Sequence, residues 1–178
     1  FQEVKCSTTM AKEYLPRRVP YPTFSMRPAR VSTAAGRLEQ QPSAQKVWQD
    51  RALTGIGPHL GGFSQSELSI IPSLEMQRYR SVLTETTPCA FAPGQSAALA
   101  EYQFRIFDLG TNLTGFVGAQ VHCEEPTQLW FLFDEILVEN DVNFKRMGCV
   151  NIIPYELAPG DYQLENAEPY TMRYIKAV

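Results

Sequence analysis

Few residues in this chain are spaced as catalytic groups usually are. There are two histidines, His59 in a glycine-rich loop and His122 in an expected strand. No G-x-S-x-G nucleophile elbow occurs, and His122 and Cys123 should point to opposite faces, because neighbours on a strand alternate. The same alternation separates Asp134 from Glu135 as a carboxylate pair if both lie on one regular strand. We therefore assign no catalytic residue.

Metal-binding patterns are equally sparse. H-E-x-x-H is absent, and none of the four cysteines forms a C-x-x-C pair, so no zinc site is expected. Oxygen ligands gather at Glu139, Asn140, Asp141 and Asn143, but the glycine and final glutamate of an EF-hand loop are missing. We predict neither a metal ion nor a cofactor.

Trp130 is the single candidate for ligand binding. By alternation it shares a strand face with Gln128 and Asp134. An aromatic ring beside polar groups on a sheet is suited to stacking on a sugar ring. Packing against a helix, loop or neighbouring domain is the commoner role, because tryptophan is usually largely buried. Trp130 is thus a candidate carbohydrate-binding residue, with packing as the alternative.

The overall composition is that of a globular protein. Of the 178 residues, 44% are hydrophobic and 20% charged, and the net charge is -3, which does not favour nucleic acid or an anionic membrane as a partner. No apolar run is long enough for a membrane span, and no signal peptide is seen at Phe1. The sparse cysteines favour a reducing cytoplasm, although secretion of a parent protein stays open. A Cys123–Cys149 bridge also stays open.

The chain divides by composition into three segments. Residues 1–36 are rich in proline and arginine and predict an extended linker or arm. Residues 37–100 are expected to be partly helical, with a capping box at Ser64 and Glu67 and a second cap at Ser73. Residues 101–178 are expected to form a β-sandwich domain.

Strand periodicity carries the fold prediction. An apolar residue recurs at every second position in two runs, and these residues should form the core: Val117, Ala119, Val121, Leu129, Phe131 and Phe133. The second run, 129–133, is apolar on its other side too, so both faces should be covered or meet a partner. Further strands are expected at 104–108, 149–157, 161–167 and 170–178. The fold class is therefore mainly β, an antiparallel, jelly-roll-like β-sandwich with a partly helical, Pro/Arg-rich N-terminal extension.

Three ordered motifs in the last third carry a resemblance to a known family. The first reads Asp108-Leu109-Gly110-Thr111-Asn112-Leu113-Thr114-Gly115, the second spans residues 129–137 and ends in an acidic pair, and the third reads Glu168-Pro169-Tyr170-Thr171-Met172-Arg173-Tyr174. Their order resembles the β-sandwich that precedes the catalytic barrel in glycoside hydrolase family 78, the bacterial α-L-rhamnosidases. Residues 15–20 are similar to the linker into that module. Ala167 and Thr171-Met172 depart from the family pattern, which leaves the sugar specificity open.

The resemblance implies an accessory role. The family's two catalytic acids work by inversion in an (α/α)6 barrel that follows the sandwich, so no catalytic residue carries over to this chain. The expected partner is that downstream barrel of the same protein. Two alternatives stay open: a lectin-like carbohydrate-binding module that uses the Trp130 face, and an interaction or assembly domain that forms a homodimer through an exposed sheet face.

The first motif also has a physical explanation of its own. Gly110 and Asn112 tolerate left-handed backbone geometry, and Asp108 can accept hydrogen bonds from the amides of a turn. Gly115 is expected where another backbone approaches closely. These are structural roles that need no substrate.

Overall fold

The computed structural model describes residues 18–41, 75–146 and 151–178. The described chain is mainly β and antiparallel, as the sequence predicts. In chain order the strands are β1 (Val31–Gln40), β2 (Tyr79–Glu85), β3 (Cys89–Ala90), β4 (Gln103–Gly115), β5 (Gly118–Cys123), β6 (Thr127–Asp134), β7 (Leu137–Val138), β8 (Asp141–Val142), β9 (Ile152–Leu157), β10 (Gly160–Glu165) and β11 (Tyr170–Ala177). No helix in these ranges is long and apolar enough to cross a bilayer.

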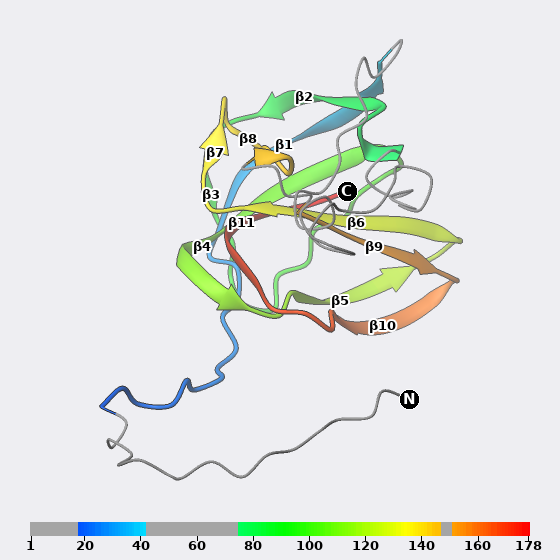
Figure 1. Ribbon diagram of the computed structural model, residues 1–178. Coiled ribbons are helices and arrows are strands. Elements are labelled where there is room, and N and C mark those ends of the chain that lie inside the picture. Colours follow the sequence, from blue (N-terminus) through cyan, green and yellow to red (C-terminus); the bar gives the residue numbers. More distant parts are fainter. Residues whose placement is uncertain (1–17, 42–74, 147–150) are drawn as a thin grey trace, which may run out of the picture.

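One large sheet organises the molecule. It is seven-stranded in the order β2-β1-β4-β11-β6-β9, with β3 added beside β1. Strands β5 and β10 form a separate two-stranded sheet, and β7 and β8 form a small hairpin. In Figure 1, β5 and β10 run side by side below β6 and β9. The two sheets therefore form two layers, as a sandwich requires.

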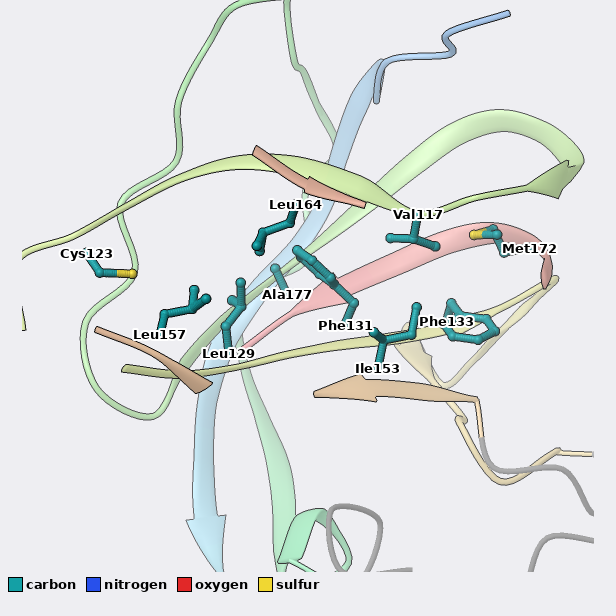
Figure 2. Packing of buried hydrophobic residues seen from close by; sticks show 10 residues of the cluster. All are labelled: Val117, Cys123, Leu129, Phe131, Phe133, Ile153, Leu157, Leu164, Met172 and Ala177. Carbon is teal, nitrogen blue, oxygen red and sulfur yellow. The ribbon is translucent and has the colours of Figure 1, made fainter. Parts of the chain in front are cut away.

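The main hydrophobic core fills the space between these two layers. Leu129, Phe131 and Phe133 of β6 share one cluster with Leu164 of β10 and Cys123 of β5 (Figure 2). Val117 is 2% exposed and Phe133 is 1% exposed. Ala119 and Val121 are partly buried and pack against the same cluster. The core predicted from strand alternation is confirmed.

The opposite face of the large sheet is covered as well. A second cluster joins Ala34 and Leu38 of β1 to Phe104 and Ile106 of β4, with Leu132 of β6 beside them. Met76 and Val142 cover this face from outside the sheet. The double-sided apolar character of residues 129–133 thus reflects cover on both faces.

The segment that precedes the predicted sandwich also contributes strands. The sequence predicted an extended arm up to residue 36. Residues 31–40 instead form β1, which lies between β2 and β4, so this prediction is wrong from residue 31 onward. Residues 79–85 form β2, so the partly helical expectation is wrong there. Among the described residues before this strand, Glu75 and Met76 are helical. The expected helix caps at Ser64, Glu67 and Ser73 and the loop with His59 lie outside the described residues.

Gly36 allows β1 to lie close to β2 and to the ring of Phe104 on β4. A Cβ at this position would lie 2.2 Å from the carbonyl oxygen of Val82 and 2.7 Å from the ring of Phe104. The register between β1 and β2 also shifts between Ala35 and Gly36. The missing side chain therefore lets two strands and an aromatic ring meet closely in the second cluster.

Candidate functional site

A cleft of about 380 Å³ opens on the second face of the large sheet. Its walls come from β2, with Tyr79 and Ser81, and from the β7–β8 hairpin, with Asp141. Leu132 of β6 and Lys176 of β11 contribute to the lining from the sheet. The cleft combines apolar and ionisable groups, so we consider it the candidate site on this face.

Lys176 is the most unusual residue of the cleft, since lysine is rarely buried. Its side chain is only 2% exposed. The ammonium lies 2.8 Å from Asp141 Oδ1, donates to Ser81 Oγ and lies 3.8 Å from the ring centre of Phe104. Burial lowers the pKa of Lys176, and the neighbouring Asp141 carboxylate opposes that shift. The amine is therefore held by three partners and serves as a structural cation.

The β7–β8 hairpin positions the counter-charge. Its two turn residues both have a left-handed backbone, with φ of 54° at Glu139 and 63° at Asn140. That pair of positive φ angles is the signature of a type I′ turn, which matches the twist of a two-stranded hairpin. Asp141 follows the turn and faces Lys176. The oxygen-rich loop at 139–143 is thus a tight hairpin, and the described residues contain no group of three or more metal-ligating side chains.

A second ion-pair cluster lies where β6 ends. Arg146 binds Asp134 through Nε at 2.7 Å and Nη2 at 2.7 Å, and Nη2 also reaches Glu135 at 3.1 Å. Asp134 is the last residue of β6, so strand alternation does not separate it from Glu135. Both carboxylates raise the pKa of Arg146 further above its usual range. This cluster connects the end of β6 to the segment after β8.

A third ion pair joins the first and third sequence motifs. Arg173 on β11 binds Asp108 on β4 through two hydrogen bonds of 2.9 Å each. The register jumps between Met172 and Tyr174, so residues 109–112 bulge opposite Arg173. The pKa of Asp108 is lowered chiefly by Arg173 and also by the amide of Gly110.

Four expectations for the first motif can be compared with this geometry. Gly110 has φ of 87°, and its amide donates to Asp108 Oδ1 at 2.7 Å. The left-handed backbone at Gly110 and the role of Asp108 as an acceptor for turn amides are therefore confirmed. Asn112 is not among the described residues with positive φ. Gly115 ends β4, and a Cβ there would meet nothing within 4 Å. The prediction that another backbone approaches Gly115 closely is therefore wrong.

Trp130 lies on the second face of the large sheet. It is partly buried against the second cluster and does not line the cleft. Its backbone N–H and C=O each form a 3.0 Å hydrogen bond with Val178. Asp134, expected on the same face, is bound to Arg146. Carbohydrate binding by Trp130 stays a prediction.

His122 and Cys123 behave as alternation predicts. His122 is exposed and its Nδ1 lies 2.7 Å from Asp161 Oδ1, whereas Cys123 is buried in the main core. Cys149 lies outside the described residues, so the proposed disulfide is not tested. Sequence reasoning missed Arg146, Arg173 and Lys176 as partners of acids; for Arg173 and Lys176, their place in the apolar-rich strand 170–178 was an available signal.

Comparison with known proteins gives limited similarity. No protein-family profile and no curated protein matches the chain. A family 78 rhamnosidase of Bacillus sp. GL1 is similar over 58% of this chain, with 16% identity and a TM-score of 0.41. A rhamnosidase from Klebsiella oxytoca with rhamnose bound is similar over 85% of this chain, with 15% identity and a TM-score of 0.36. The chain spans 13% and 26% of those two proteins, so the similarity concerns a part of each and carries no argument about activity.

Proposed function

We propose that this chain is a non-catalytic accessory β-sandwich of an α-L-rhamnosidase-type glycoside hydrolase, which supports an (α/α)6 catalytic domain. The observation that carries the proposal is the contact between Asp108 and Arg173. These residues belong to the first and third of the sequence motifs that resemble that module. Their pairing gives both motifs a shared structural purpose, because the ion pair fixes the bulge of β4 against β11.

The state of the buried carboxylates supports a non-catalytic role. Inverting glycoside hydrolysis needs one carboxylic acid and one carboxylate, about 6.5–9.5 Å apart, with a water molecule between the base and the sugar. Asp108 and Asp134, the two buried acids of the described chain, each bind an arginine. The hydrogen-bonded Arg173 lowers the pKa of Asp108, which makes this carboxylate a poor proton donor at neutral pH.

The first test is enzymatic. The purified chain is incubated with p-nitrophenyl α-L-rhamnoside and related aryl glycosides, and we expect no turnover above the buffer rate. Asp134→Asn and Glu135→Gln serve as controls against a contaminating hydrolase. Reproducible turnover that both substitutions abolish would show that the chain is itself an enzyme.

The second test concerns the parent protein. The reading frame around this segment is determined, and we expect it to encode a further domain with helical periodicity. The whole protein should hydrolyse an aryl rhamnoside, whereas deletion of this segment should lower its thermal stability or its yield. A parent protein without glycosidase activity would contradict the proposed function.

A further inference from the structure

The segment that leads into β1 is extended, basic and almost uncovered. Every side chain from residue 18 to residue 28 is exposed, including Phe24 at 85% and Met26 at 90%. Residues 18–30, here called the arm, contain Arg18, Arg27 and Arg30 and no acidic residue. Figure 1 shows the arm in blue, leaving the sheet and running away from it. Large apolar side chains in such a position indicate a surface that has a binding partner.

The two-stranded β5–β10 sheet has the opposite charge. No lysine or arginine occurs between Arg105 and Lys145, or from Asn151 to Met172. The exposed acids on these strands and beside them are Glu124, Glu125, Glu156, Asp161, Glu165 and Glu168. Within the described residues, β5 and β10 pair only with each other, so the outer edge of each strand is open. The sheet is therefore an acidic surface with room for an extended segment beside it.

The chain's own arm contributes little cover to this surface. The backbone amide of Arg30 binds the carbonyl of Asp108, which fixes the base of the arm beside β4. Phe24 approaches Phe116, just before β5, with ring centres 6.3 Å apart. Phe24 stays 85% exposed and Phe116 43% exposed in spite of this contact. A second copy would give these side chains the cover that the arm's own molecule does not supply.

We propose that the arm of one molecule binds the acidic β5–β10 sheet of a second copy, which forms a symmetric arm-exchanged dimer. The eleven residues from 18 to 28 can extend over about 36–40 Å. Six-residue strands such as β5 and β10 are only about 20 Å long, so the arm has sufficient reach. In a two-fold dimer each arm makes the same contact, which doubles the contribution of every arginine and aromatic residue. This assembly does not depend on the hydrolase assignment.

The first test measures the oligomeric state by analytical ultracentrifugation of the whole chain. We expect a reversible dimer that dissociates as the salt concentration rises, because exposed charge pairs are screened. Arg18→Glu with Arg27→Glu should raise the dissociation constant at least about tenfold. The control, Arg78→Glu with Lys145→Glu, makes the same change in net charge outside the arm and should leave the dimer intact.

The reciprocal test changes the acidic surface. Glu124→Lys with Glu165→Lys should also raise the dissociation constant. Mixing this variant with the arm variant should restore a heterodimer, because its wild-type arm meets a wild-type sheet and its reversed sheet meets a reversed arm. Phe24→Ser tests the apolar part and should raise the dissociation constant without altering the circular dichroism spectrum. A wild type that stays monomeric at all concentrations, including one whose arm folds onto its own sheet, would overturn the proposal. A dimer that both charge reversals leave unchanged would overturn it equally.

Discussion

The ammonium of Lys176 lies 3.8 Å from the centre of the Phe104 ring, on the side of the sheet that also holds Asp141. An aromatic face attracts a cation most strongly where water is excluded. The ring and the carboxylate together therefore keep a charged lysine in a position where an isolated charge would be costly.

This arrangement predicts an asymmetry between the two partners of the ion pair. Asp141→Ala should destabilise the fold by about 3 kcal/mol, because it leaves a buried cation without its counter-charge. Lys176→Met should cost less, since the methionine fills the same space and Asp141 can be hydrated. Urea unfolding of the two variants makes the comparison. Equal losses of unfolding free energy would contradict this account of the pair.

A second prediction concerns the acid dependence of stability. Arg173 lowers the pKa of Asp108 in the folded chain below its ordinary value of 3.8. The resulting stabilisation is complete above that ordinary value and is lost as the pH falls toward the lower folded value. Asp108→Asn should therefore have a flatter stability curve below about pH 4 than the wild type. Thermal unfolding between pH 2 and pH 6 would reveal identical curves if the ion pair had no such effect.

A third prediction uses two glycines that differ in their surroundings. Gly36→Ala should destabilise the chain by about 3 kcal/mol, because the new Cβ meets the Val82 carbonyl at 2.2 Å. Gly115→Ala is the matched control, since nothing lies within 4 Å of its Cβ and its φ is not positive. It should change the stability by less than about 1 kcal/mol. A Gly36 variant as stable as the control would show that β1 and β2 can separate without cost.

A fourth prediction concerns Trp130. Because its ring packs against the second cluster, Trp130→Ala should lower the unfolding free energy by about 2 kcal/mol. Calorimetric titration with rhamnose and plant oligosaccharides should give no saturable heat with the wild type or the variant. Saturable heat in the wild type that disappears in the variant would favour the carbohydrate-binding alternative.

Local periodicity predicted the main core because alternate residues of β5 and β6, such as Val121 and Phe131, are apolar and face inward. It missed β1, because Gly36 and Arg37 interrupt the apolar pattern of that strand. Its position depends on close contacts with Val82 and Phe104, which lie far away in the sequence.

The candidate site was largely unpredictable for a related reason. A lysine near the end of a strand is expected to reach solvent, and only the distant residues Ser81, Phe104 and Asp141 make burial of Lys176 tolerable. No short motif encodes such a partnership. Trp130, in contrast, was placed correctly on the second face by alternation alone.

The place of β11 in the large sheet has a consequence for the order of synthesis. This strand lies between β4 and β6, although it follows all the other described strands in the sequence. A ribosome must therefore release residues 170–177 before the β2-β1-β4 half can join the β6-β9 half. Until β11 pairs with them, the facing edges of β4 and β6 stay without hydrogen-bond partners, and such edges can pair with other nascent chains. Until β11 emerges, the nascent polypeptide needs either rapid synthesis of the intervening residues or a chaperone that covers those edges.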